Sequence, residues 1–380
     1  MDFFSLKIKE KVLFFLIGTL LLFLAYSEAL KNISVYLLIG FFIWGTLTGR
    51  IKITKDIINI SIISHLAVVL IGVFLGINTN ESLNQVMDVI HIVIIFLFFR
   101  EANLKFLTYE KILNLLFVGF AFAFLAGMDE LLSNNLNRLE LHSVGSVNRS
   151  AVYIMYIFVA SLCLKDEYQE RLSSLLFPLI LIISLISIII GASRMAILST
   201  PIILILYLIL SKKFTLKLFS LLCVFVFTAS FLVINLLPDS FIVAKLSYGF
   251  NDAPRVQIWI SSIYAWTTNN LLFGIGVGNS IFIDVKEYFP NTALTRYIDN
   301  PHNVYLDMLL ERGLLGLVTF VTFLFSILSL KENNQNFLVY IRILVFSLLL
   351  LGIANITFRY EFALLFVIFI GSYLNPSIKK

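Results

Sequence analysis

Apolar stretches of about 20 residues recur along the whole chain and are separated by short polar segments. A backbone in lipid must satisfy its own hydrogen bonds, which favours helices of this length. The pattern therefore predicts an all-α polytopic membrane protein with about twelve transmembrane helices. We expect the spans at residues 11–27, 33–48, 57–77, 84–100, 110–132, 149–165, 173–191, 194–210, 216–236, 303–330, 338–357 and 359–374.

The composition agrees with this pattern. Hydrophobic residues make up 59% of the 380 residues and charged residues 13%, against about 45–50% and about 25% in soluble domains. This balance excludes a soluble globular protein, and 37 Phe with 15 Tyr exclude disorder. Cys163 and Cys223 lie in apolar runs, so we expect neither a disulfide framework nor a cysteine-rich metal site. The first span has no clear cleavage site after it and is interpreted as a retained helix.

The positions of the basic residues predict the orientation in the membrane. With the N-terminus in the cytoplasm, the short inside segments carry most of the basic residues, which is the positive-inside pattern. Both termini are then cytoplasmic, and the net charge of +5 is a topology signal rather than a sign of nucleic-acid binding. The inside lysines are Lys7, Lys9, Lys11, Lys52, Lys55, Lys105, Lys111, Lys165, Lys212, Lys213, Lys217, Lys331, Lys379 and Lys380.

Arginine rather than lysine dominates the outside segments. Lysine is sufficient for topology, whereas the planar guanidinium grips phosphate or carboxylate with two parallel hydrogen bonds. The outer face is therefore expected to hold an anion; the alternative is that these arginines only snorkel at helix ends. The outer set is Arg138, Arg149, Arg194, Arg255, Arg296, Arg312 and Arg359.

Residues 237–302 are predicted to form one large external loop between spans 9 and 10, inserted in a single membrane domain that covers 1–380. Within the loop, 255–269 is expected to be a helix, because apolar residues including Trp259 and Trp266 recur at spacings of three and four. Such a helix suits the membrane–water boundary. The glycine-rich segment 271–280 follows; it lacks the dinucleotide-binding spacing and predicts a turn that lies against a helix or a ligand.

The loop ends in a segment with the signs of a helix start. Asn300 is a good N-cap and Pro301 suits the first helical position, which would place His302 in the first turn of a membrane helix. The helix dipole disfavours an imidazolium there, so a neutral ring could accept a proton from a hydroxyl. The alternative is a polar residue that only faces water. Gly313 and Gly316 are expected to mark a bend or close helix packing.

Three segments in this order resemble the O-antigen ligase and O-antigen polymerase superfamily of bacterial membrane glycosyltransferases. They are Ser193-Arg194-Met195-Ala196, Arg255 through Gly276, and Pro301 through Gly316. The resemblance covers about 180–330. Met195 departs from the small residue usual after the arginine.

The resemblance implies a GT-C-like fold, no metal and no cofactor. It also implies a donor glycan linked to undecaprenyl pyrophosphate, a lipid A–core acceptor, and a site that faces the periplasm from the bacterial inner membrane. Carried over by motif, Arg194 and Arg255 would hold the pyrophosphate, with Arg149 and Arg312 as helpers, and His302 would act at the acceptor hydroxyl or the donor phosphate. Asp299, Asn303 and Glu311 are further candidates for a base or an orienting group.

We favour a ligase over a polymerase. The reaction is expected to invert the configuration of the anomeric carbon, which the stereochemistry of the product would test. A transporter or flippase is the alternative from another class, since twelve spans suit one. Few ionisable groups lie mid-span, however, and Asp88 and Glu361 form no obvious relay. A membrane scaffold without chemistry is a third reading, which the outer arginines argue against.

Overall fold

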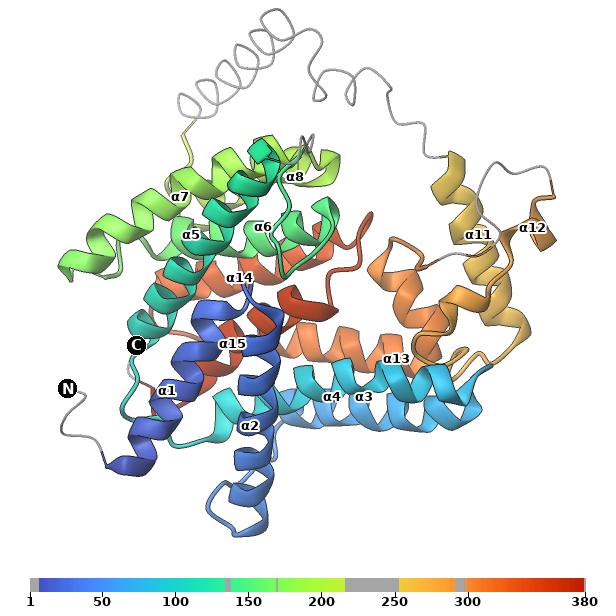
Figure 1. Ribbon diagram of the computed structural model, residues 1–380, viewed down its shortest axis with the longest axis horizontal. Helices are drawn as coiled ribbons and strands as arrows, with labels where there is room; N and C mark the ends of the chain where they lie inside the picture. The colour runs from blue at the N-terminus through green and yellow to red at the C-terminus, as the bar shows by residue number, and fades with distance from the viewer. Residues whose placement is uncertain are drawn as a thin grey trace, which may run out of the picture.

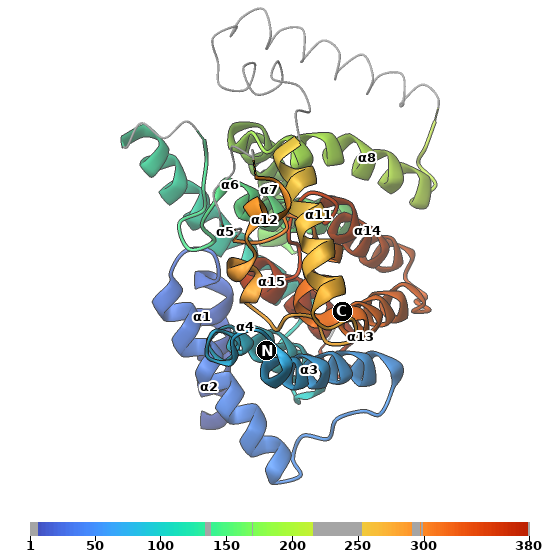
Figure 2. The ribbon, with the colours of Figure 1, turned by 90° about the vertical axis from the view of Figure 1, so that its right-hand side faces the viewer.

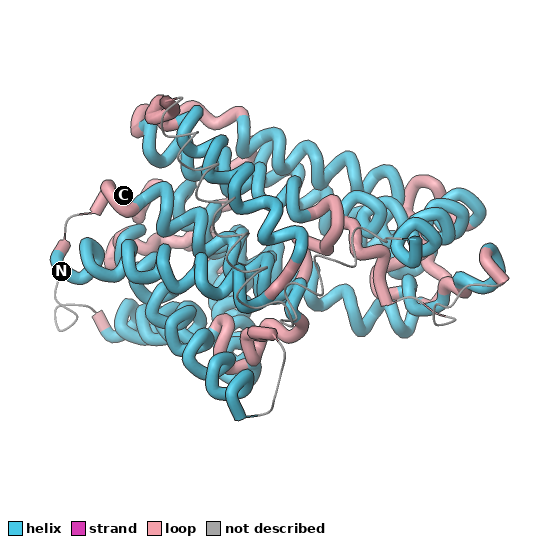
Figure 3. Tube along the Cα trace, turned by 90° about the horizontal axis from the view of Figure 1, so that it is seen from above, coloured by secondary structure: helices cyan, strands magenta, loops and turns pink. Residues whose placement is uncertain are grey.

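The computed structural model describes residues 7–133, 138–168, 170–215, 253–290, 297 and 299–378. The described residues form α-helices, one 3-10 helix and two isolated β-bridges (Figures 1 and 3). The elements are α1 (Ile8–Phe23), α2 (Glu28–Leu47), α3 (Ile57–Leu75), α4 (Thr79–Glu101), α5 (Tyr109–Ser133), α6 (Val147–Leu164), α7 (Arg171–Gly191), α8 (Arg194–Leu210), α11 (Ala253–Thr268), η2 (Asn279–Phe282), α12 (Val285–Tyr288), α13 (Val304–Leu328), α14 (Gln335–Leu351) and α15 (Tyr360–Leu374).

Each predicted span within the described residues corresponds to a helix, with ends that differ by a few residues. Seven of these helices are long and apolar enough to cross a membrane: α2, α3, α4, α5, α6, α7 and α13. The shorter helices α8, α14 and α15 are also apolar. The ninth expected span, 216–236, lies outside the described residues, as does most of the loop that follows it. The chain is therefore a polytopic α-helical membrane protein.

The distribution of exposed apolar side chains fits a lipid environment. On α7 a stripe at spacings of three and four is exposed rather than buried, which is the reverse of a soluble helix. By contrast, every residue of α6 from Ser150 to Leu164 is buried, as is α15 from Glu361 to Tyr373. These two helices form the centre of the bundle, and α4, α7 and α14 pack around them. The exposed stripe consists of Leu172, Leu175, Leu179, Ile182, Ile186 and Ile189.

The connections between helices gather at two opposite ends of the bundle. At the lysine-bearing end, Thr54 Oγ1 donates to Glu101 Oε2 at 2.8 Å, and Asn336 Nδ2 donates to Glu167 Oε2 at 3.1 Å. At the other end lie the segments before α6, between α7 and α8, before α13 and between α14 and α15. These are the segments in which arginine was expected to dominate, so one end of the fold collects the proposed anion-binding residues.

The segment after α11 packs against α13 and forms hydrogen bonds with its backbone (Figure 2). Gly313 breaks α13 with φ 67° and ψ −170°, a conformation that only glycine adopts readily. The backbone N–H groups of Leu314 and Leu315 donate to the carbonyls of Leu271 and Leu272 at 2.9 and 3.1 Å. The predicted bend at Gly313 is confirmed, and the predicted glycine-rich turn lies against this helix.

Candidate functional site

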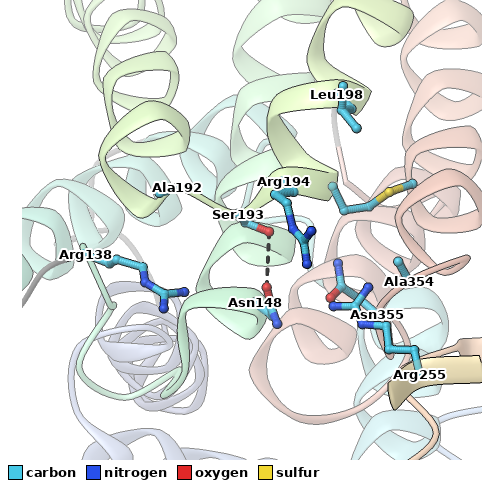
Figure 4. A pocket seen from close by; sticks show the side chains of 10 residues that line it. Arg138, Asn148, Ala192, Ser193, Arg194, Leu198, Arg255, Ala354 and Asn355 are labelled. Atoms are coloured by element: carbon cyan, nitrogen blue, oxygen red, sulfur yellow. Dashed lines mark hydrogen bonds between the residues drawn. The ribbon is translucent and has the colours of Figure 1, made fainter. Parts of the chain in front are cut away.

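Three arginines from three separate segments line one cavity of about 100 Å³ (Figure 4). Arg138 precedes α6, Arg194 opens α8 and Arg255 lies in the first turn of α11. Asn148 and Asn355 complete the polar side of this arginine cavity. The lining thus carries an excess of positive charge and of hydrogen-bond donors, the combination that binds phosphate and carboxylate groups.

The tight turn between α7 and α8 positions Arg194. Ala192 ends α7 in the left-handed region at φ 49°, and Ser193 is the residue that precedes α8. Ser193 Oγ donates a hydrogen bond to Asn148 Oδ1 at 3.2 Å, which ties the turn to the start of α6 (Figure 4). Met195, the departure from the family pattern, lines the same cavity. The backbone therefore reverses within two residues and directs the arginine to the cavity.

A second cavity of about 410 Å³ lies beside the arginine cavity and shares Asn148 and Asn355 with it. This histidine cavity is lined by His302, Arg149 and Tyr360. The guanidinium carbon of Arg149 lies 4.1 Å from the centroid of the Tyr360 ring, a cation–π distance. Asp299, Asn300 and Ser146 are further polar residues at its wall. Two adjoining cavities, one rich in arginine and one with a histidine, offer room for two reacting groups.

The prediction that Asn300 caps a helix containing His302 is wrong. The helix begins at Val304, and Asn303 is its N-cap, whose Oδ1 accepts from the N–H groups of Tyr305 and Leu306. Asn300 Oδ1 instead accepts a hydrogen bond from the His302 N–H at 3.0 Å. This side-chain bond stabilises a turn at residues 300–302 in place of the first turn of a helix. His302 therefore lies before the helix, in the left-handed region at φ 51°.

The imidazole of His302 favours the neutral form, although not for the expected reason. Burial lowers its pKa below the ordinary 6.5, and the positive charge of Arg255 lowers it further; Asp299 opposes this and Arg149 adds to it. Burial first and the arginines second, rather than a helix dipole, are thus the cause. A neutral ring that faces a cavity can accept a proton from a bound hydroxyl group.

Hydrogen bonds join the histidine segment to both of its neighbours. Trp259 Nε1 donates to Pro301 O at 2.9 Å, which connects α11 to the residue before His302. On the other side, Asn303 Nδ2 donates to Ile353 O at 2.9 Å. The N–H of Val304 also donates to Gly352 O at 2.9 Å. The histidine is therefore fixed relative to both Arg255 and the segment that carries Asn355.

The structure does not bring Glu311 and Arg312 to either cavity. Both side chains are buried within the bundle, where Arg312 Nη1 lies 3.6 Å from Asp307 Oδ2. Arg359, at the start of α15, forms an ion pair with Glu311 and lies 3.4 Å from Asp307 Oδ1. These four residues make a charge-balanced buried cluster. Its position favours a role in joining α13 to α15 over the helper and base roles predicted for Arg312 and Glu311.

Sequence reasoning missed Asn148, Asn355 and Tyr360 as members of the site. Asn148 stands beside Arg149, which was singled out, and Tyr360 follows an outer arginine. The residues around Asn355 carry no such signal, because the predicted span 338–357 places Asn355 inside a membrane helix, whereas α14 ends at Leu351. Its proximity to the arginine cavity depends on how α14 and α15 pack. Among the described residues, no group of three or more His, Cys, Asp or Glu side chains could hold a metal ion.

The fold and site define an α-helical membrane protein with an arginine-lined cavity next to a histidine at one end of its helices. Residues 179–321 match the protein family described as O-antigen ligase. The resemblance predicted from Arg194, Arg255 and His302, which all lie in this segment, is thereby confirmed for the O-antigen ligase and polymerase superfamily. No curated protein matches the chain. Arg138, Arg149 and Asn355 line the cavities from outside the matched segment.

Proposed function

We propose that the protein is an O-antigen ligase, which transfers a glycan from undecaprenyl pyrophosphate to a sugar hydroxyl of lipid A–core. The observation that carries this proposal is the meeting of Arg138, Arg194 and Arg255 in one cavity that adjoins the cavity of His302. The family match supports the general class of activity. The proposal places this end of the helices at the periplasmic face of the bacterial inner membrane, because the lysine-bearing connections lie at the other end.

The arginine cavity suits the leaving group of this reaction. A departing pyrophosphate carries negative charge, and preorganised donors stabilise such charge without a cost of reorganisation during the reaction. Arg194, Arg255 and Arg138 come from three separate segments, so they can surround the two phosphates from different sides. In this proposal Arg149 acts from the adjoining cavity. Arg312, whose side chain is buried beside Asp307, acts only through the packing of α13.

The apolar wall of the arginine cavity suits a lipid-linked donor. Met195 and Leu198 line this wall, and Leu198 is 43% exposed. Ile202, one helical turn further along α8, is 44% exposed. An isoprenoid chain attached to the pyrophosphate would leave the cavity along this outward face of α8, into the lipid.

His302 is the proposed base for the acceptor. In the transfer step the hydroxyl oxygen of the acceptor sugar bonds to the anomeric carbon of the donor glycan. The bond between that carbon and the phosphate oxygen breaks, and its electron pair leaves with undecaprenyl pyrophosphate. The hydroxyl proton passes to the neutral imidazole of His302. Direct displacement in this arrangement inverts the anomeric carbon. Asp299, at the same cavity wall, is the alternative proton acceptor, and Asn303 holds the histidine segment in place.

The resemblance further implies a GT-C-like membrane domain of about twelve spans with the loop 237–302 inserted in it, and we include this in the proposal. A reporter protein fused at residue 245 tests the orientation. Periplasmic activity of the reporter is expected. A cytoplasmic signal would reverse the topology and remove the site from the face where lipid A–core is completed.

The activity is tested by the lipopolysaccharide profile of cells that lack the protein, with the native chain, Arg194→Ala and His302→Ala supplied in turn. Loss of a ligase leaves bare lipid A–core while polymer accumulates on undecaprenyl pyrophosphate. If core carrying one repeat unit accumulates instead, the protein is an O-antigen polymerase. An unchanged profile contradicts both activities and favours a transporter, which an uptake assay in proteoliposomes would then detect.

A further inference from the structure

Asn355 lies at the junction of the two cavities with a buried amide group. It is among the residues that line the arginine cavity and also among those that line the histidine cavity. The residue is 4% exposed, and its Nδ2 has no hydrogen-bond partner among the described residues. Buried polar groups in folded proteins are nearly always paired, so an unpaired amide at a cavity junction calls for an explanation.

The surroundings of Asn355 explain why the protein itself does not pair this amide nitrogen. Its neighbours in the arginine cavity are Arg194, Arg255 and Arg138, whose guanidinium groups are donors only. Asn148 Oδ1, an acceptor in the same wall, already accepts from Ser193 Oγ. Figure 4 shows Asn355 beside Arg194 and Arg255. Asp299 and Asn300, the acceptors at the wall of the histidine cavity, make no hydrogen bond to this N–H either. A bound group that pairs with it must therefore bring its own acceptor oxygen.

The connection that carries Asn355 is held in a fixed position. Thr357 Oγ1 donates to Leu348 O at 3.0 Å, and the Thr357 carbonyl accepts from Tyr156 Oη at 3.1 Å. At its beginning, the carbonyls of Gly352 and Ile353 accept from Val304 N–H and Asn303 Nδ2. The amide is therefore preorganised relative to His302, with little freedom to turn towards a protein acceptor.

We propose that Asn355 binds the donor substrate by donating a hydrogen bond from Nδ2 to a phosphate oxygen of the undecaprenyl pyrophosphate group. This inference rests on the proposed function, since it takes the pyrophosphate to occupy the arginine cavity. The phosphate that carries the glycan then lies at the junction, between the arginines and His302. There the amide adds a neutral donor to the charged ones and orients the bond that is broken.

The substitution Asn355→Leu tests this assignment, because leucine has nearly the same shape and lacks the amide. The full-length protein in detergent is titrated with undecaprenyl pyrophosphate, and the dissociation constant and the thermal midpoint without ligand are both measured. Loss of one hydrogen bond to a charged phosphate is expected to raise the dissociation constant about 10- to 100-fold. The thermal midpoint without ligand is expected to stay equal or to rise, because the variant no longer buries an unpaired polar group.

Asn375→Leu is the matched control. Asn375 is 2% exposed, but its Nδ2 donates to Phe99 O at 2.7 Å and to Ala102 O at 2.9 Å. Its replacement should lower the thermal midpoint and leave the dissociation constant unchanged. This opposite pattern distinguishes an asparagine whose amide binds a ligand from one whose amide stabilises the fold.

Two results overturn the inference. One is native affinity in Asn355→Leu, and the other is a fall in its thermal midpoint like that of Asn375→Leu, which would mean that the amide has a structural partner. Both leave the proposed function standing as long as the native chain binds undecaprenyl pyrophosphate. If the native chain does not bind it, the proposed function is wrong and the assignment of Asn355 fails with it.

Discussion

The indole nitrogen of Trp259 donates a hydrogen bond to the carbonyl oxygen of Pro301, the residue immediately before His302, at 2.9 Å. Trp259 lies one helical turn after Arg255 on α11. The bond therefore joins the element that carries one proposed pyrophosphate ligand to the segment that carries the proposed base. Asn303 and Val304 also donate hydrogen bonds to the connection between α14 and α15, which carries Asn355. These bonds therefore hold the segments of Arg255, His302 and Asn355 together.

Trp259→Phe should reduce glycan transfer several-fold while the protein remains folded. The substitution keeps an aromatic ring and removes only the bond to Pro301, whose net contribution to stability is about 1 kcal/mol. Trp266→Phe is the control, because Trp266 Nε1 donates to Leu271 O at 3.0 Å, away from the histidine. Transfer and thermal midpoint are measured for both variants. Equal rates in the two variants would show that the bond to Pro301 does not position the base.

Arg194→Lys and Arg255→Lys should each lose most of the transfer activity, although both keep the positive charge. Lysine lacks the planar fork that contacts two phosphate oxygens at once. Removal of one preorganised donor costs about 3–4 kcal/mol, or about 10²- to 10³-fold in turnover. Arg50→Lys is the control, because Arg50 stacks over Trp44 at the lysine-bearing end, 4.3 Å from the ring centroid. Full activity of the lysine variants at the cavity would argue against bidentate binding.

The rate of transfer should depend on the protonation of His302. Burial and Arg255 lower its pKa below 6.5, so the neutral base predominates at pH 7 and is lost as the pH falls through this lowered pKa. Arg149→Gln removes a nearby positive charge and should move the acid limb of the pH–rate profile to higher pH. A profile that does not move would mean that another group, such as Asp299, is the base.

Gly313→Ala should destabilise the protein by more than about 2 kcal/mol. The residue has φ 67°, and an added Cβ would lie 2.3 Å from the carbonyl carbon of Leu272. Gly18→Ala in α1 is the control, since its Cβ would meet nothing within 4 Å and alanine favours a helix by about 1 kcal/mol. The thermal midpoint should fall for the first variant and stay or rise for the second. A similar effect in both would mean that the break in α13 is not required.

Arg359→Met should reduce the yield of folded protein sharply, because it leaves Glu311 and Asp307 with only Arg312 to balance them. Loss of one partner from a buried ion pair costs about 3–5 kcal/mol. The double variant Arg359→Met with Glu311→Met keeps the Asp307–Arg312 pair and restores charge balance. Its folded yield and transfer activity should both recover. A folded but inactive double variant would return Glu311 to the list of groups that act in the reaction.

Hydrophobic periodicity predicted the helices well, because each span must satisfy its own backbone hydrogen bonds in lipid. The helix at 194–210 has the predicted bounds, and the helix within the loop differs by two residues at its start. The span predicted at 303–330 also agrees with α13, but the helix start predicted from Asn300 and Pro301 is wrong, because Asn300 accepts from the His302 N–H in a turn and α13 begins at Val304. Several residues in this segment are suitable N-caps, and which of them caps the helix depends on side-chain hydrogen bonds that residue preferences do not determine.

Those residues of the proposed site whose chemical type and position in the sequence indicate a function could be predicted. Arginines on one side of the membrane, and a histidine next to a helix start, indicated an anion site with a base, and the structure brings Arg194, Arg255 and His302 to adjoining cavities. The opposite outcome for Arg312 has a plain cause: it lies two turns inside α13, where its side chain turns inward to the carboxylate of Asp307. The position of Asn355 at both cavities could not be predicted, because it depends on contacts between segments that are distant in the sequence.

The break in α13 at Gly313 limits how this protein can be recombined with its relatives. The backbone at Leu271 and Leu272 supplies acceptors for N–H groups that the broken helix leaves open, so the segment after α11 completes the helix. A chimera that exchanges the external segment at its two ends would separate these partners. A graft intended to transfer acceptor specificity must therefore carry the chain from α11 through Leu315 as a single piece.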